Sequence, residues 1–265
     1  MTANRVLCCT ALVGSLALAP GIAKADEPTE AQMGAQLFTQ LKSQGEIVKS
    51  SPLYDTLRPI AAAITKAVQP RYEYPIHFYI VHENQPNAFA APGGNIYVVD
   101  SLLYFVKNTE ELAGTLCHES SHLLHHDSMA VMKHNEEIRR RALAATILLG
   151  PSIAHILTLE AIGQLDANHY SRGAEEAADL TGADTCASAG YNPWGLVWLF
   201  SDFSNAQLKA PPEILSDHPN DAHRIECLKS HFAANPATFA RFSSDPKTAK
   251  PLRVPKNEQE QFLRP

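Results

Sequence analysis

The residues best suited to chemistry are His118, Glu119 and His122, which form the pattern H-E-x-x-H. On a helix, residues four apart share a face, so both imidazoles can bind one metal ion. Glu119 lies one step round the helix, where its carboxylate can accept a proton from a water on that ion. The spacing predicts a catalytic zinc site; the alternative is an exposed polar helix face.

A catalytic zinc usually has three protein ligands. In the extended motif H-E-x-x-H-x-x-G-x-x-H, the last histidine is the third ligand. This extension is absent here, because His125 stands at the glycine position and Ser128 at the position of the last histidine. The third ligand must therefore come from another part of the chain.

Glu175 is the best candidate for this ligand. Asp179 lies one turn further along the same predicted helix face, where it can accept a hydrogen bond from a ligand histidine and fix its tautomer. Glu176 and Glu160 are competitors. The alternative for this segment is a solvated acidic face paired with Arg172.

The elements that must position these residues are mostly helical. The motif lies in a helix predicted over 109–127, and two β-rich segments, 76–81 and 95–99, precede it and predict a small hairpin or meander. The fold class is therefore α+β, mostly helical. Further helices are predicted over 30–48, 53–69, 101–106, 129–149, 151–165, 169–189, 193–207 and 220–232.

Two further segments have distinctive composition. Residues 142–157 are apolar but interrupted by Gly150-Pro151, which predicts a buried helical hairpin or, alternatively, a lid or membrane-touching flap over a cleft. Residues 233–265 carry five prolines and predict an extended C-terminal tail with little core of its own.

The N-terminus resembles a secretory signal peptide over residues 1–25. Arg5 precedes the apolar run Val6–Ala19, and Ala23-Lys24-Ala25 matches a small-x-small cleavage site. The apolar run is shorter than the roughly 20 residues that a membrane-spanning helix needs. We therefore expect an exported protein with one domain over 26–232.

Three cysteines remain beyond this segment: Cys117, Cys186 and Cys227. In an oxidising compartment an odd number allows one internal disulfide. We expect Cys186 to pair with Cys227, which leaves Cys117 beside the metal motif unpaired. The alternative is three small core residues.

Composition limits the partners. Among 265 residues, 22 basic and 28 acidic side chains give a net charge of −6 with no long run of either sign. Nothing therefore favours nucleic acid as a partner. The 12 histidines agree with metal binding, since histidine is the commonest metal ligand.

The chain resembles metallopeptidase family forty-eight, the zinc metallopeptidases that include the CAAX prenyl endopeptidase, HtpX and BepA. Four segments match in the family's order and together cover about residues 30–232. They are Asn87–Gly94 with the following Ile-Tyr-Val, Glu111–His122, Tyr170–Gly182, and His218-Pro with Arg224.

The resemblance implies a zincin-like domain whose edge strand flanks the active-site helix. It implies one zinc ion held by His118, His122 and Glu175, with Glu119 as general base and acid and Asp179 behind a histidine ligand. The chain departs from many bacterial members at His126-Asp127, to which we assign no role.

The resemblance also places His218 and Arg224 near the metal, as an oxyanion donor or, for His218, as a cap on the zinc; the alternative is an ordinary helix-capping loop. The edge strand would bind an extended substrate through its backbone. The substrate-binding residues expected there are Ala91, Pro92, Gly93, Gly94, Asn95 and Ile96.

We therefore expect a periplasmic zinc metalloendopeptidase that cleaves unfolded or misassembled envelope proteins. The alternatives are a zinc-dependent chaperone or assembly factor with capped or vestigial protease activity, and a helical domain without metal. The sequence leaves the substrate and the oligomeric state open.

Overall fold

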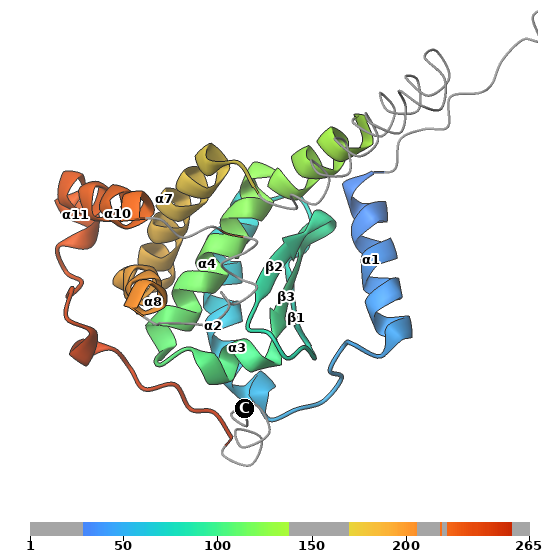
Figure 1. Ribbon diagram of the computed structural model, residues 1–265, viewed down its shortest axis with the longest axis horizontal. Coiled ribbons are helices and arrows are strands. Elements are labelled where there is room, and N and C mark those ends of the chain that lie inside the picture. Colours follow the sequence, from blue (N-terminus) through green and yellow to red (C-terminus); the bar gives the residue numbers. More distant parts are fainter. Residues whose placement is uncertain (1–28, 138–169, 206–217, 219–221, 256–265) are drawn as a thin grey trace, which may run out of the picture.

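A computed structural model of the chain describes residues 29–137, 170–205, 218 and 222–255. These residues form several helices around one three-stranded sheet (Figure 1), which confirms the α+β, mostly helical class. The predicted signal peptide lies outside the described residues. So do Glu160, the apolar segment 142–157 and the helix predicted over 151–165.

The first two helices begin and end close to their predicted bounds. α1 (Glu30–Gln44) starts with a capping box between Thr29 and Gln32. α2 (Leu53–Val68) buries apolar side chains spaced three and four residues apart, a spacing that places them on one face of the helix. These buried side chains are Leu53, Leu57, Ile60, Ile64 and Val68.

The sheet has three strands, β1 (His77–Val81), β2 (Ala88–Ala91) and β3 (Asn95–Val99), in the spatial order β1-β3-β2. β3 pairs parallel with β1 and antiparallel with β2. The predicted hairpin between 76–81 and 95–99 is therefore wrong. The reason is the additional strand β2, whose sequence Ala-Phe-Ala-Ala has little of the β-branched pattern that marks strands.

This strand order also corrects the predicted substrate edge. Asn95 and Ile96 belong to the central strand β3, with partners on both sides, and Pro92–Gly94 form the turn that joins it to β2. Of the expected substrate-binding residues, Ala91 lies in β2, the edge strand beside the active-site helix.

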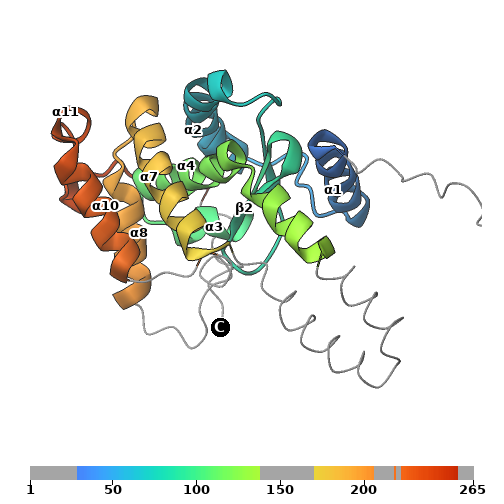
Figure 2. The ribbon, with the colours of Figure 1, turned by 90° about the horizontal axis from the view of Figure 1, so that it is seen from above.

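After the short helix α3 (Asp100–Phe105), α4 (Thr109–His125) passes through the centre of the molecule. Asn108 caps its first turn by accepting a hydrogen bond from the Glu111 backbone N–H. Every residue of α4 from Glu110 to Leu123 is buried, because the sheet covers one side and the later helices cover the other (Figure 2).

The later helices are α7 (Arg172–Ala189), α8 (Trp194–Asn205), α10 (Ala222–Ala234) and the single turn α11 (Pro236–Phe239). α7 and α8 pack on α4, and α10 packs on α7. Figure 2 shows the resulting order across the molecule: α10, α7, α4, sheet and α1.

Part of the C-terminal segment packs against the main core. Phe239 is 2% exposed and its ring lies 4.8 Å from that of Phe232. Further along the segment, the Ser244 carbonyl accepts a hydrogen bond from the indole N–H of Trp198 on α8, at 2.9 Å. Residues 240–255 then lie as a strap over the helices (Figure 1), and Phe242 packs against the main core.

Among the described helices, none combines the length and the apolar character needed to cross a membrane.

Candidate active site

His118, Glu119 and His122 share the buried middle of α4, and none of them is more than 3% exposed. The Nε2 atoms of the two histidines lie 3.0 Å apart. The four-residue spacing therefore brings both imidazoles to one point, as predicted.

Helix α7 brings Glu175 to the same point. Its carboxylate oxygens lie 3.4 Å from His118 Nε2 and 3.6 Å from His122 Nε2. The close approach of the two helices depends on Gly182, because a Cβ there would lie 3.1 Å from the His118 backbone N and Cα. The competitor Glu176 points away from this cluster, toward His223.

His218 completes the cluster, although it stands in a part of the chain that is described only at that residue. Its Nδ1 lies 2.8 Å from Glu175 Oε1, and its Nε2 lies 3.4 Å from Glu119 Oε1. Donor atoms of His118, His122, Glu175 and His218 all lie within 4.8 Å of one another.

The cluster fits a zinc ion on two grounds. Imidazole nitrogens and a carboxylate oxygen are ligands that zinc prefers. In addition, Glu119 Oε1 and His218 Nε2 are buried without a hydrogen-bond partner among the described residues. Buried polar atoms are rarely left unpaired, so a group bound beside these two atoms would account for both.

A carboxylate orients each of the two helix histidines. Asp179 Oδ1 lies 2.9 Å from His118 Nδ1, as the sequence predicts, and Asp127 Oδ2 lies 2.8 Å from His122 Nδ1. Asp127 received no predicted role. It reaches His122 because His126 ends α4 in the left-handed conformation, at φ 55°, a turn that helical spacing does not show.

Arg224 also lies at the site, where it contacts the carboxylates of Asp179 and Glu175. Its Nε and one terminal nitrogen each donate to Asp179 at 2.7 Å, and its other terminal nitrogen lies 2.8 Å from Glu175 Oε2. Its cation also lies over the Phe200 ring. This arrangement suits a residue that positions Asp179 and Glu175 rather than a donor to a reacting oxygen.

Tyr170 is a site residue that the prediction did not include, although it begins the matched segment Tyr170–Gly182. Its ring stacks on His122 with centroids 3.9 Å apart, and its hydroxyl lies 2.9 Å from Ser128 Oγ. Ser128 in turn donates to the Ala90 carbonyl at 2.8 Å. These contacts connect the metal cluster to the edge strand β2.

The same strand contacts Glu119 directly, because the Ala90 N–H donates to Glu119 Oε2 at 3.0 Å. The turn after it lies under α1: Gly93 N–H donates to Glu30 at 3.2 Å, and Asn95 donates to the Gly34 carbonyl at 3.4 Å. The expected substrate-binding residues Gly93 and Asn95 are therefore held by α1.

Burial and hydrogen bonds together set the pKa values of the cluster. Burial raises the pKa of the Glu119 carboxyl, which makes it a stronger base than an exposed glutamate. Burial lowers the pKa of His122 to about 3, so its imidazole is neutral. Burial opposes ionisation of Glu175, but hydrogen bonds from His118 and His218 outweigh it and lower the Glu175 pKa.

The predicted disulfide is wrong. Cys186 pairs with Cys117, with Cα atoms 5.7 Å apart, and Cys227 lies near His223 instead. The physical reason is that α7 packs directly on α4, which brings Cys186 beside Cys117, the residue before His118. The disulfide therefore joins the two helices that carry the metal cluster.

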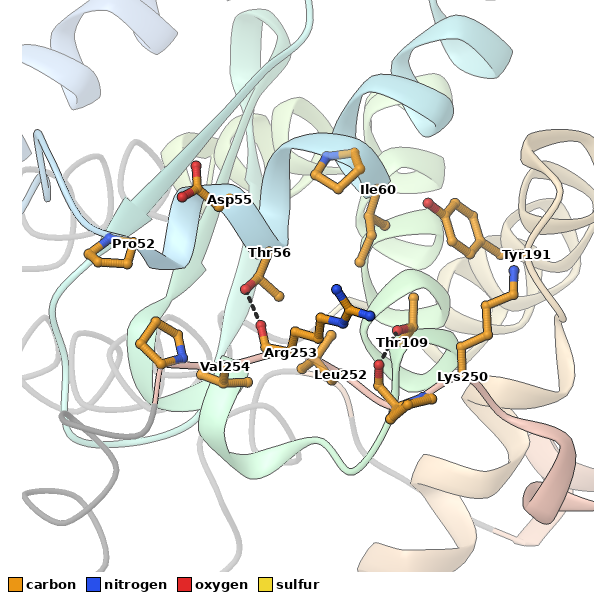
Figure 3. A pocket seen from close by; sticks show the side chains of 13 residues that line it. Pro52, Asp55, Thr56, Ile60, Thr109, Tyr191, Lys250, Leu252, Arg253 and Val254 are labelled. Carbon is orange, nitrogen blue, oxygen red and sulfur yellow. Dashed lines mark hydrogen bonds between the residues drawn. The ribbon is translucent and has the colours of Figure 1, made fainter.

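A groove of about 800 Å³ lies elsewhere, between α2 and the C-terminal strap (Figure 3). Thr109 donates to the Pro251 carbonyl at 3.4 Å, and Thr56 donates to the Arg253 carbonyl. The residues that line this groove include none of the metal cluster.

Two histidines on one helix, a glutamate from a second helix and a glutamate base beside them define a zinc metallopeptidase centre. A model of peptidase family M48 matches residues 55–231, so the chain belongs to peptidase family M48. This membership confirms the family resemblance and agrees with the predicted zinc cofactor.

Curated relatives have low identity. The beta-barrel assembly-enhancing protease of Yersinia pestis is 28% identical over 161 residues, which cover 57% of this chain and 33% of that protein. Metalloprotease YcaL of Escherichia coli K12 is 26% identical over 192 residues, covering 70% and 72%. Mitochondrial metalloendopeptidase OMA1 of Schizosaccharomyces pombe is 27% identical over 165 residues, covering 57% and 45%.

The chain thus spans 33% to 42% of the first beta-barrel assembly-enhancing proteases that it matches.

Proposed function

We propose that this protein is a zinc-dependent endopeptidase with Glu119 as its general base. The observation that carries the proposal is the convergence of His118, His122 and Glu175, whose side-chain contacts are 3.6 Å or shorter. Glu119 Oε1 lies at the same cluster, 3.4 Å from His218 Nε2, and has no hydrogen-bond partner among the described residues. Zinc, when bound there, supplies a Lewis acid that polarises a peptide carbonyl and acidifies water.

The chain's own residues perform the proton transfers. Glu119 Oε1 takes a proton from the attacking water, while Oε2 stays on the Ala90 N–H and holds the carboxylate in place. Glu119 then gives this proton to the leaving amine as the peptide bond breaks. Asp179 and Asp127 keep the histidine rings oriented, and Arg224 holds Asp179 and Glu175.

We infer that an extended substrate pairs with β2. The N–H and carbonyl of Ala90 bond to side chains, Glu119 and Ser128, so both groups point away from β3. A substrate strand would exchange the Ser128 hydroxyl for its own backbone N–H. Backbone pairing reads little side-chain information, which suits unfolded or misassembled proteins as substrates.

The beta-barrel assembly-enhancing proteases among the relatives support envelope proteins as the substrate class. Together with the signal-like residues 1–25, this supports export to a bacterial periplasm. An N-terminus at Asp26 in protein purified from the periplasmic fraction would agree with export; an intact N-terminus in the cytosolic fraction would contradict it.

The decisive variant is Glu119→Gln, assayed for cleavage of an unfolded protein such as casein. We expect a rate loss of about 10²- to 10⁴-fold, since the general base is removed, with the zinc content of the wild-type protein. Glu226→Gln, an exposed pair partner of Lys229 on α10, is the matched control and should retain full activity.

Casein cleavage by Glu119→Gln at the wild-type rate, with zinc retained, would overturn the proposal. The alternative of a zinc-dependent chaperone predicts a different pattern. Wild type and Glu119→Gln would both suppress aggregation of an unfolded protein, and neither would cleave it.

A further inference from the structure

A second group of metal-binding side chains lies outside the active site, on the outer surface where α10 packs on α7. Glu176 comes from α7, and His223 and Cys227 come from α10. Their carboxylate oxygen, imidazole nitrogen and sulfur atoms all lie within 4.8 Å of one another. The His223 side chain is 72% exposed and that of Glu176 is 45% exposed, so an ion can reach them.

The spacing of these side chains suits one small ion. His223 and Cys227 are four residues apart and share a helix face. Cys227 Sγ lies 3.4 Å from His223 Nε2, and Glu176 Oε2 lies 3.9 Å from the same nitrogen. Ligands at the ordinary zinc distances of a tetrahedral site stand roughly 3.3 to 3.8 Å apart.

The chemistry of the donors selects the class of ion. A thiolate and an imidazole favour zinc and similar transition metals, whereas magnesium and calcium require oxygen ligands. We propose that Glu176, His223 and Cys227 form a second zinc-class site, with water at the fourth position. On binding, the Cys227 thiol releases its proton to solvent and the sulfur binds as a thiolate.

Another cluster, Glu30, Glu73 and His126, carries no such proposal. Glu30 already accepts hydrogen bonds from Tyr72 at 2.6 Å and Gly93 at 3.2 Å, and it lies 2.7 Å from His126. These contacts occupy both oxygens of Glu30.

The location of the second site gives it a structural role. Glu176 follows Glu175 in the chain, and His223 precedes Arg224. An ion bound by both helices therefore ties α10 to α7 beside the contacts from Arg224 to Asp179 and Glu175. We expect it to stabilise this junction through preferential binding to the folded state.

Cobalt substitution tests the proposal without an activity assay. The test uses protein that begins at Asp26 and therefore lacks Cys8 and Cys9. In this protein the active-site cluster has no cysteine, and Cys117 and Cys186 form a disulfide, so a sulfur-to-cobalt charge-transfer absorption band reports on Cys227. We expect wild type to show this band and to bind two equivalents of cobalt. Cys227→Ser and His223→Ala should each bind one equivalent, and Cys227→Ser should show no band.

His231→Ala is the matched control. His231 also joins α10 to α7, through Asp184 at 3.0 Å, but it is not part of the site. This variant should keep both equivalents and the band. The circular dichroism of each variant checks folding, and the zinc-dependent rise in Tm should be smaller in Cys227→Ser than in His231→Ala.

One equivalent of cobalt with no charge-transfer band in folded wild type would overturn the second site, as would an undiminished band in His223→Ala. Either result leaves the proposed peptidase function untouched, because that function depends on the His118, His122 and Glu175 cluster.

Discussion

At the metal cluster, a carboxylate orients each of the two ligand histidines on α4. Asp127 holds His122 at 2.8 Å, and its own pKa is lowered to about 2: burial opposes this, but bonds from His122 and His125 outweigh it. Asp127 is therefore ionised at neutral pH and accepts the Nδ1 proton of His122. This leaves Nε2 of His122 to bind the metal.

We expect Asp127→Asn to weaken zinc binding by about 10- to 100-fold, because the neutral amide orients His122 less firmly. Competition with a chromogenic chelator measures this affinity. Asp184→Asn, an exposed aspartate on α7, serves as the control. Equal zinc affinity in both variants would show that Asp127 does not orient His122.

The role of His218 can be determined from the rate at which a His218→Ala variant cleaves casein. Its Nδ1 lies 2.8 Å from Glu175 and its Nε2 lies 3.4 Å from Glu119, so the ring lies beside both a proposed zinc ligand and the proposed base. If this ring caps the metal in most molecules, His218→Ala should cleave casein about tenfold faster. His77→Ala, at an exposed position on β1, should cleave at the wild-type rate.

A rate loss in His218→Ala, with His77→Ala unaffected, would contradict the cap and assign His218 to stabilisation of the oxyanion.

Between elements, the contact of α4 with α7 determines the geometry of the site. Gly182 allows α7 to lie against the backbone of His118, and the disulfide from Cys117 to Cys186 joins the same two helices. Glu175 and Asp179 lie two turns and one turn before Gly182. A small change in helix separation therefore moves both carboxylates relative to the histidines.

We expect Gly182→Ala to lower the free energy of unfolding by about 1 to 3 kcal/mol, since its Cβ would lie 3.1 Å from the His118 backbone. Zinc affinity should fall as well. Urea denaturation measures the first effect and chelator competition the second.

Gly173→Ala is the matched control, because a Cβ at Gly173 meets only the Ser171 hydroxyl oxygen, at 4.0 Å. Since alanine favours a helix more than glycine does, this control should be as stable as wild type or slightly more so. Equal stability of the two variants would contradict the close approach at Gly182.

Across the whole molecule, the C-terminal segment joins the helical half to the elements around the sheet. Phe239 packs among the later helices, and the Lys250 carbonyl accepts a hydrogen bond from the Thr109 N–H at the start of α4, at 2.9 Å. Thr56 on α2 bonds to Arg253 a little further on (Figure 3). Along the chain, the strap thus contacts α8, then α4 and then α2.

We expect Phe239→Ala to lower the free energy of unfolding by about 3 to 5 kcal/mol, because it leaves a cavity beside Phe232. Phe242→Ala, which truncates a half-buried ring three residues later, should cost less. Urea denaturation compares the two. A loss for Phe239→Ala no larger than that for Phe242→Ala would show that the tail adds little to the core.

Sequence patterns are enough to predict the class of protein and the centre of its site. His118 and His122 belong to one helix, and Glu175 and Asp179 to another, so local helical periodicity places each pair on a common face. Glu119 follows His118 one step round the same helix.

The folded structure was needed to show which residues far apart in the sequence contact one another. Cys186 pairs with Cys117 rather than Cys227, β3 lies between β1 and β2, and Asp127 reaches His122 after a left-handed residue. The physical reason is that these contacts depend on how closely helices and strands approach one another. Spacing within one element carries no information about that approach.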